Sequence, residues 1–225
     1  MGLDISKIQA LCFDVDGTLS DTDDQWIQKF SKMISPLRFL APKSDPKHVA
    51  RWMVMGLESP GNVFYEAMDR IHLDDDIGRV FNFIAQKKIG HKPKQFWIVP
   101  GVLEMLSFLR IKFPMAVVSA RDDYTTRLFL NQFKIIDYFK NIVTAQSCAY
   151  TKPFPDPVLL AASQMSVPAD HCLMIGDTTV DIRAGKAAGA QTVGVLCGFG
   201  TERELRRAGA DLILQSTADL IDIFL

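Results

Sequence analysis

Short apolar segments alternate with segments of helical spacing along most of this chain, and that alternation limits the possible folds more than any other feature of the sequence. Strands linked through helices pair in parallel by right-handed crossovers, which covers both faces of the sheet with helices. We therefore predict an α/β fold with a doubly wound parallel sheet. The predicted strands are 8–13, 115–119, 141–144, 172–175, 191–196 and 211–214, and the predicted helices are 102–111, 123–133, 157–165, 181–188 and 202–208.

The segment 21–96 interrupts this alternation. It contains no convincing strand, and its large apolar residues have helical spacing, as in the run from Trp26 to Ile34. We therefore predict an all-helical domain at 21–96 that is inserted into a core made of 1–20 and 97–225.

Two aspartates follow the first predicted strand, in the sequence FDVDGTLSDT that begins at Phe13. Alternate residues of an extended chain share a face, so Asp14 and Asp16 are expected to converge just beyond the strand. Adjacent buried anions repel unless a cation offsets them, and a hard divalent ion such as Mg²⁺ suits carboxylate oxygens. Gly17 permits a tight turn there, and Thr18 adds a hydroxyl. Taken alone, the stretch is also typical of a solvated surface turn.

Three later segments, each at a predicted strand end, add further polar groups. In a doubly wound sheet the carboxyl ends of the strands lie at one edge, so these groups should meet the two aspartates there. Carboxylates, a lysine, a hydroxyl and backbone amides are together the equipment of phosphoryl transfer, where positioning and charge neutralisation dominate. The residues are Ser119, Ala120 and Arg121 in MAVVSARDD, Lys152 in YTKPFPDP, and Asp177 and Asp181 in CLMIGDTTVDIRAG.

In this order and at these strand ends, the four segments resemble the four motifs of the haloacid dehalogenase (HAD) superfamily of phosphatases. The resemblance covers the core on both sides of the insertion, and the insertion is similar to the C1 cap of one subfamily. The closing stretch GVLCGFGTERELRRAGADLIL resembles phosphoglycolate phosphatase-like members. The resemblance implies a Rossmann-like, HAD-type sheet with an all-α cap, Mg²⁺ as the cofactor and an aspartyl-phosphate intermediate.

The resemblance also assigns roles to the residues. Asp14 is the expected nucleophile, and Asp16 the expected general acid and base. The expected magnesium ligands are the Asp14 carboxylate, the Asp16 backbone carbonyl and Asp177, with Asp181 as a ligand or as an acceptor behind the ligands. Lys152 is expected to counter the charge of Asp14 and of the phosphate. The residues expected to bind substrate are Thr18, Ser119, the amide of Ala120, Arg121 and Lys152.

Two details separate this chain from other branches of the superfamily. Haloacid dehalogenases lack the second aspartate of the first motif, so Asp16 argues against dehalogenation. Family members often carry Asn after the Ser119 position, whereas Ala120 keeps only its backbone donor. Arg121 either binds phosphate or substrate through the paired N–H donors of its guanidinium, here called the fork, or pairs with nearby acids. In the cap, Arg51 and Glu58 are candidate specificity contacts.

The expected function is hydrolysis of a small phosphomonoester metabolite, of the phosphoglycolate or sugar-phosphate class. A β-phosphoglucomutase-like phosphotransferase is the first alternative, and a non-catalytic binding protein on the same fold is the second.

Composition narrows the range of partners. Lys and Arg total 25 against 26 Asp and Glu, for a formal net charge of −1, so we expect neither a nucleic-acid nor a membrane partner. No apolar run reaches the roughly 18 residues of a spanning helix, and the N-terminus does not resemble a signal peptide. The four scattered cysteines favour reduced thiols in the cytoplasm. A monomer or a homodimer is expected.

Overall fold

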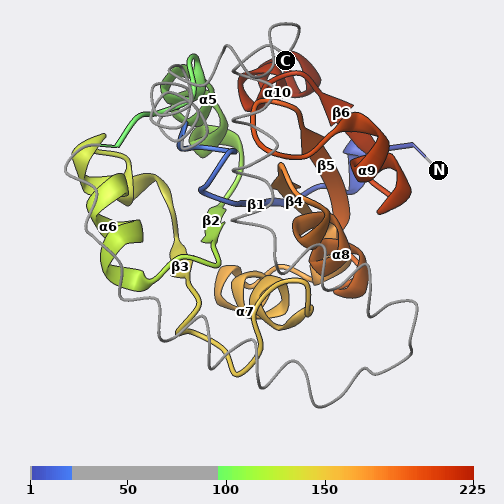
Figure 1. The fold of residues 1–225 in the computed structure, drawn as a ribbon, viewed down its shortest axis with the longest axis horizontal. Helices are drawn as coiled ribbons and strands as arrows, with labels where there is room; N and C mark the ends of the chain where they lie inside the picture. The colour runs from blue at the N-terminus through green and yellow to red at the C-terminus, as the bar shows by residue number, and fades with distance from the viewer. Residues whose placement is uncertain (1, 22–95) are drawn as a thin grey trace, which may run out of the picture.

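A six-stranded parallel sheet forms the centre of the computed structural model, which describes residues 2–21 and 96–225 (Figure 1). The strand order is β3-β2-β1-β4-β5-β6, and every neighbouring pair runs in parallel. The predicted fold class is thereby confirmed. The strands are β1 (Ala10–Phe13), β2 (Met115–Val118), β3 (Asn141–Val143), β4 (Cys172–Gly176), β5 (Gln191–Val195) and β6 (Leu212–Leu214).

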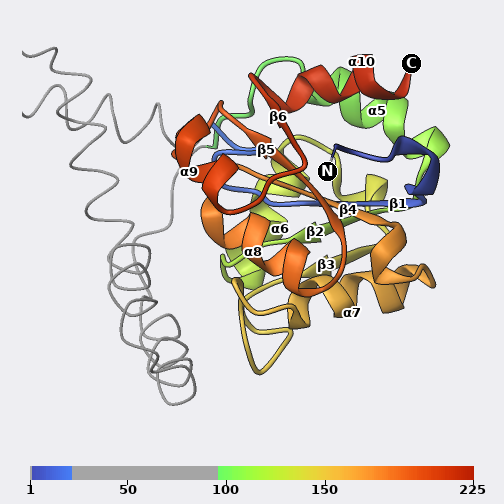
Figure 2. The ribbon, with the colours of Figure 1, turned by 90° about the vertical axis from the view of Figure 1, so that its right-hand side faces the viewer.

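Helices cover both faces of this sheet, as Figure 2 shows for α5 and α10 on one face and α7 on the other. Alternate residues of β1 explain the two faces, since Leu11 and Phe13 pack into one apolar cluster and Ala10 and Cys12 into the other. The longer helices begin and end within a few residues of their predicted bounds. The helices are α5 (Val102–Lys112), α6 (Asp123–Gln132), α7 (Asp156–Met165), α8 (Thr179–Ala187), α9 (Glu202–Arg207) and α10 (Leu220–Phe224).

The order of the strands reverses beside β1. From β1 the chain moves outward through β2 and β3 on one side, and it then crosses to β4 and continues outward on the other. In doubly wound sheets, ligands bind beyond the carboxyl ends of the strands at this reversal. The fold therefore places the ligand site just after Phe13 and Gly176, the last residues of β1 and β4.

The described residues that flank the segment 22–95 lie side by side. The Asp21 N–H donates to the Trp97 carbonyl at 3.1 Å, and the Val99 N–H donates to the Leu19 carbonyl at 3.0 Å. The chain thus leaves the core and returns to it at one place, next to the end of β1. The predicted helices of the insertion and the candidate contacts Arg51 and Glu58 lie outside the described residues, and the domain boundaries stay a prediction.

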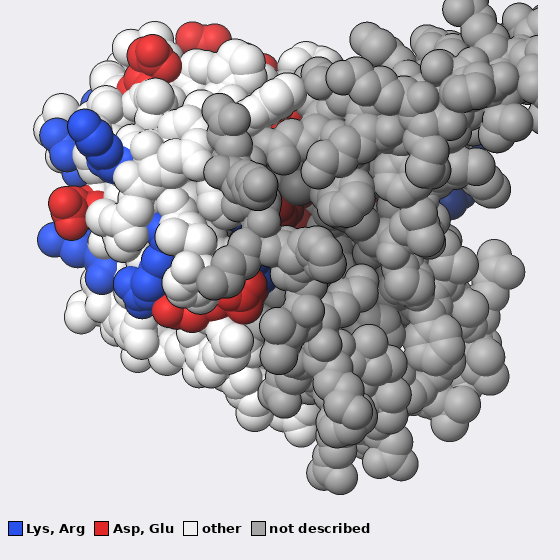
Figure 3. Space-filling model, turned by 60° about the vertical axis from the view of Figure 1, so that its left-hand side comes forward, with Lys and Arg blue, Asp and Glu red and all other residues white. Residues whose placement is uncertain are grey.

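Charged side chains of both signs are interspersed on the face of the described core that Figure 3 shows. None of the described helices combines the length and the apolar character that crossing a membrane requires. All four cysteines are free thiols, with Cys12 and Cys172 buried in the core.

Candidate active site

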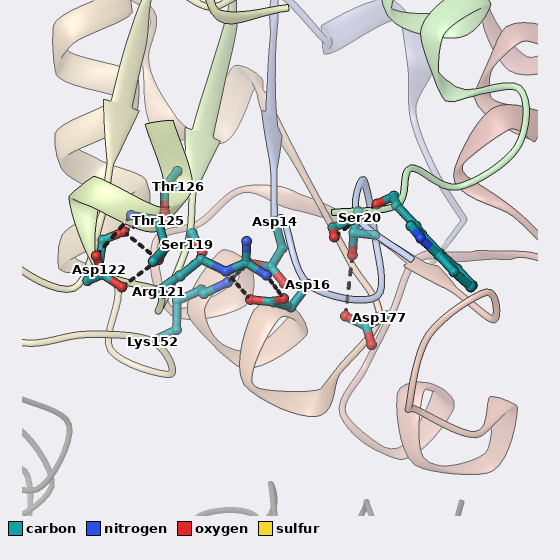
Figure 4. A network of polar contacts seen from close by, with 12 residues as sticks. Asp14, Asp16, Ser20, Ser119, Arg121, Asp122, Thr125, Thr126, Lys152 and Asp177 are labelled. Atoms are coloured by element: carbon teal, nitrogen blue, oxygen red, sulfur yellow. Dashed lines mark hydrogen bonds and ion pairs between the residues drawn. The ribbon is translucent and has the colours of Figure 1, made fainter. Parts of the chain in front are cut away.

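Polar residues from four loops meet at the carboxyl end of the sheet (Figure 4). Asp14 follows β1 directly, Ser119 follows β2, and Asp177 follows β4. The pairing of Phe13 with Ile175 and of Phe13 with Val117 brings these three strand ends level with one another. The convergence that was predicted from the strand ends is therefore present in the structure.

Lys152 is buried between two aspartates. Its Nζ donates to Asp14 Oδ1 at 2.7 Å and to Asp181 Oδ1 at 2.5 Å. The side chains of all three residues are almost fully buried, with exposed fractions of 3% for Lys152, 9% for Asp14 and 1% for Asp181. Burial by itself lowers the pKa of Lys152, but the two carboxylates outweigh burial and hold the pKa above its ordinary value. Lys152 is therefore a permanent cation in the site.

Asp14 lies in surroundings that disfavour its negative charge. Burial, reinforced by the charges of Asp181 and Asp16 and opposed by Lys152, raises the pKa of Asp14 to about 7. Near neutral pH the Asp14 carboxyl is therefore protonated in a large part of the molecules. A further cation close to it would favour the ionised form.

Three buried carboxylates face a common point. Oxygen atoms of Asp14, Asp177 and Asp181 all lie within 4.8 Å of one another. Lys152 supplies one positive charge to this group, which leaves two negative charges uncompensated when all three acids are ionised. Buried charges of that kind need a counter-ion, and oxygen ligands suit Mg²⁺. The donor set and its charge therefore fit a divalent cation.

Asp181 is also committed to the start of α8. Its Oδ2 accepts hydrogen bonds from the Thr178 N–H at 3.0 Å and from the Thr178 hydroxyl at 2.6 Å. With the bond from Lys152 on Oδ1, Asp181 has protein donors on both oxygens. This arrangement favours Asp181 as an acceptor that orients Lys152 and the helix, behind any direct ligands.

Asp177 is held by close approach of the backbone from two other loops. A Cβ atom at Gly17 or at Gly198 would overlap its carboxylate, and the Phe199 N–H donates to its Oδ2 at 2.8 Å. The fully buried Thr18 donates its hydroxyl to Asp177 Oδ1 at 3.3 Å. Thr18, expected among the substrate-binding residues, thus lies against an acid of the site.

Ser119 and Arg121 are linked directly. The Arg121 N–H donates to Ser119 Oγ at 3.1 Å, and the Ser119 N–H donates to the Val143 carbonyl at 2.9 Å. Ser119 is buried, whereas Ala120 between them is exposed. The hydroxyl of Ser119 therefore has a fixed place at the end of β2, beside the aspartates that follow β1 (Figure 4).

Arg121 forms a two-pronged ion pair with Asp16. Nε donates to Asp16 Oδ2 at 3.0 Å, and Nη2 donates to Asp16 Oδ1. Of the two possibilities for Arg121 that the sequence leaves open, the structure shows pairing with an acid, and the acid is the second aspartate of FDVDG. The sequence did not indicate this partner.

A doubly wound sheet with a buried carboxylate and lysine cluster at its strand reversal is typical of an enzyme that acts on a small anionic ligand. The sequence identifies the family of enzymes. It matches the model of the haloacid dehalogenase-like hydrolase family over residues 11–195, and the chain belongs to that family.

Relatives of similar length match nearly the whole chain. A pyrophosphatase, PpaX, from Anoxybacillus flavithermus is 27% identical over 96% of this chain and 97% of its own. A phosphoglycolate phosphatase from Chromobacterium violaceum is 26% identical over 98% of both chains. The solved structure of a haloacid dehalogenase-like hydrolase from Streptococcus pneumoniae has the same fold, with a TM-score of 0.68 and 21% identity over 98% of this chain and all of that one.

Proposed function

We propose that this hydrolase is a Mg²⁺-dependent phosphatase that acts on a small phosphomonoester through an aspartyl-phosphate. The observation that carries the proposal is the contrast between the two aspartates of FDVDG. Asp14 is buried against Lys152, whereas Asp16 is 35% exposed and is held by Arg121. Two carboxyls in such different surroundings suit two different tasks, one nucleophilic and one acid–base.

The first step follows from this division of tasks. Asp14 attacks phosphorus, the bond between phosphorus and the leaving oxygen breaks, and Asp16 gives that oxygen a proton. Lys152 offsets the negative charge that gathers where Asp14 and the phosphoryl group meet. Ser119 and the Ala120 amide are the proposed donors to the phosphoryl oxygens.

The second step reverses the role of Asp16. It takes a proton from a water molecule, whose oxygen then attacks phosphorus and displaces Asp14, so that inorganic phosphate leaves. The proposed holders of Mg²⁺ are Asp14, the Asp16 carbonyl and Asp177, with Asp181 behind them. When bound, Mg²⁺ would supply positive charge that offsets the negative charge of the phosphoryl oxygens.

Phosphoglycolate is the first substrate we propose, with sugar phosphates next. The names of the relatives support a small acidic phosphate, since one is a phosphoglycolate phosphatase and another a pyrophosphatase. A mutase of the β-phosphoglucomutase kind would use the same aspartyl-phosphate but pass the phosphoryl group to a sugar hydroxyl. Cytoplasmic location and a monomeric or homodimeric state stay predictions.

A panel of phosphate esters tests the function. With Mg²⁺, the wild-type protein should release inorganic phosphate from at least one small acidic ester, and EDTA should reduce that release to background. The panel should include phosphoglycolate, sugar phosphates and pyrophosphate, and each product should be identified by chromatography as well as by phosphate release. Isomerised sugar phosphate with little free phosphate would favour the mutase, and no reaction with any ester would reject both.

The metal site has its own prediction. Asp177→Asn should raise the Mg²⁺ concentration for half-maximal activity by about 100-fold or more, and Gly198→Ala by about 10-fold, because its new Cβ displaces the Asp177 carboxylate. Gly189→Ala is a stringent control, since it strains a backbone of positive φ, which Gly198 does not have, but its new Cβ meets no neighbour. Titration calorimetry with Mg²⁺ measures the effect without turnover. Unchanged affinity in both Asp177→Asn and Gly198→Ala would contradict the assignment.

A further inference from the structure

Arg121 and Asp16 face one another as two planar groups. Two nitrogens of the guanidinium donate to the two oxygens of the carboxylate, so both the direction and the plane of the carboxylate are set (Figure 4). A lysine in this place offers a single point charge and fixes neither. The side chain of Arg121 is only 14% exposed, whereas that of Asp16 is 35% exposed. The arginine is therefore the better-anchored member of the pair.

Three contacts anchor the arginine. The guanidinium lies over the ring of Phe96, with its central carbon 5.3 Å from the ring centre. The Arg121 N–H donates to Ser119 Oγ, and the Arg121 carbonyl accepts from the Ala145 N–H at 3.1 Å. The backbone and the side chain of Arg121 are thus both fixed, independently of Asp16.

Phe96 is itself held firmly. The side-chain amide of Gln132 binds its backbone on both sides, accepting from the Phe96 N–H at 3.1 Å and donating to the Phe96 carbonyl at 2.8 Å. The Phe96 ring packs edge-on against Phe129, and Phe129 and Gln132 both belong to α6. A rigid helix therefore supports the aromatic surface on which the guanidinium rests.

We propose that Arg121 is a positioning residue that holds the Asp16 carboxylate in the orientation needed for proton transfer in both steps of the reaction. This inference rests on the proposed function, because it takes Asp16 as the acid and base. Asp16 lies in the turn after β1 and is partly exposed, and Arg121 binds both of its carboxylate oxygens, so loss of Arg121 should change the orientation of the carboxylate. A misplacement of about 1 Å at a reacting group can cost about 100-fold in rate.

A competing role for Arg121 is direct binding of the substrate. Its Nη1 is buried and has no hydrogen-bond partner among the described residues, so one donor remains to be satisfied. If Arg121 bound an acidic group of the substrate, its loss would weaken binding of acidic esters and spare neutral ones. Positioning of Asp16 predicts the opposite, a loss of kcat that is shared by acidic and neutral esters with little change in KM.

The test compares Arg121→Ala, Arg121→Lys and Arg127→Ala. Arg127 is a matched control, because it pairs with Asp123 on the exposed side of α6, away from the site. For the best alkyl phosphate of the panel, Arg121→Ala should lower kcat by about 100-fold with KM changed less than about threefold. Arg121→Lys should stay within about threefold of Arg121→Ala, because charge without the fork does not orient a carboxylate. Arg127→Ala should match the wild type.

A burst experiment separates positioning from general damage. With 4-nitrophenyl phosphate the leaving group needs no proton, so Arg121→Ala should still phosphorylate Asp14 and release about one equivalent of nitrophenolate at once. The slow hydrolysis that follows needs Asp16 as base, and it should be about 100-fold slower than in the wild type. Loss of the burst, rescue by Arg121→Lys, or an effect confined to the KM of acidic esters would each overturn the proposal.

Crystal structures of the wild type and Arg121→Ala provide a second readout that does not depend on activity. We expect one orientation of the Asp16 carboxylate in the wild type and several, or a different one, in the variant. An unchanged Asp16 would overturn the positioning role even if turnover fell. A wild type that hydrolyses no phosphate ester would reject the proposed function instead, while this structural comparison would still decide whether Arg121 orients Asp16.

Discussion

Asp14→Asn should abolish phosphatase turnover, by on the order of 10⁴-fold or more, while the protein stays folded. The amide has nearly the shape of the carboxylate but does not attack phosphorus, so no aspartyl-phosphate forms. Phosphate release from the best ester of the panel measures the loss, and mass spectrometry of the quenched reaction checks for a phosphorylated chain. Turnover within about tenfold of the wild type would contradict the assignment of Asp14 as nucleophile.

The stability of the same variant gives a control for misfolding. In the folded chain the pKa of Asp14 is raised to about 7, so the folded state favours its protonated form. The contribution of Asp14 to stability is therefore fully present below the ordinary pKa of an aspartate and is lost as the pH rises from about 4 toward 7. The uncharged Asn does not undergo this loss. Without metal at pH 7.5, Asp14→Asn should accordingly melt at or above the wild-type temperature, and a lower melting temperature would point to unfolding as the cause of inactivity.

Lys152→Met should reduce both activity and stability severely. It leaves the buried carboxylates of Asp14 and Asp181 without the cation that donates to both. Removing one partner of a buried ion pair costs about 3–5 kcal/mol of stability. Lys152 lowers the pKa of the buried Asp14, which burial raises to about 7, so its loss raises that pKa further, and the free energy of unfolding should fall further as the pH is raised from 6 to 8. Urea unfolding at both values measures this.

Lys186→Met is the matched control for that experiment. Lys186 also binds an aspartate, Asp211, but its side chain is 38% exposed at the surface. Partly exposed pairs of this kind contribute about 1 kcal/mol or less. Equal losses of stability in the two variants would show that burial of Lys152 between the acids is not what makes it important.

The parts of this molecule that were predicted from the sequence are those with a local signal. Buried parallel strands are short apolar runs, and the polar residues Asp14, Ser119 and Asp177 follow such runs directly. The rule that parallel strands end at one edge then brings them together without any knowledge of the loops. The same rule places Lys152 only approximately, because Lys152 lies well inside the loop between β3 and α7 and not at the end of the strand.

The parts that were missed depend on contacts between distant residues. Arg121 and Asp16 are 105 positions apart, and Thr18 and Asp177 are 159 positions apart. No periodicity reports such pairs, because they depend on how two loops are folded. The short helix α10 (Leu220–Phe224) was missed for another reason, since five residues are too few to display helical spacing.

The contact between the Phe199 N–H and Asp177 has only a weak signal in the sequence. Gly198 and Gly200 flank it in the loop after β5, and close spacing of glycines often marks a close approach of backbone. In the structure both glycines lie against Asp177. The sequence offered nothing to connect that loop with this particular aspartate.

The hydrogen bonds that join Leu19 and Asp21 to Val99 and Trp97 have a consequence for how this chain can change over evolutionary time. The two ends of the inserted segment are already fastened to each other by the core. The entropy of closing a loop grows only slowly with its length, so a longer, shorter or unrelated insert alters the stability of the sheet little. The segment 22–95 can therefore be exchanged while the aspartates, the lysine and the strands beneath them stay as they are.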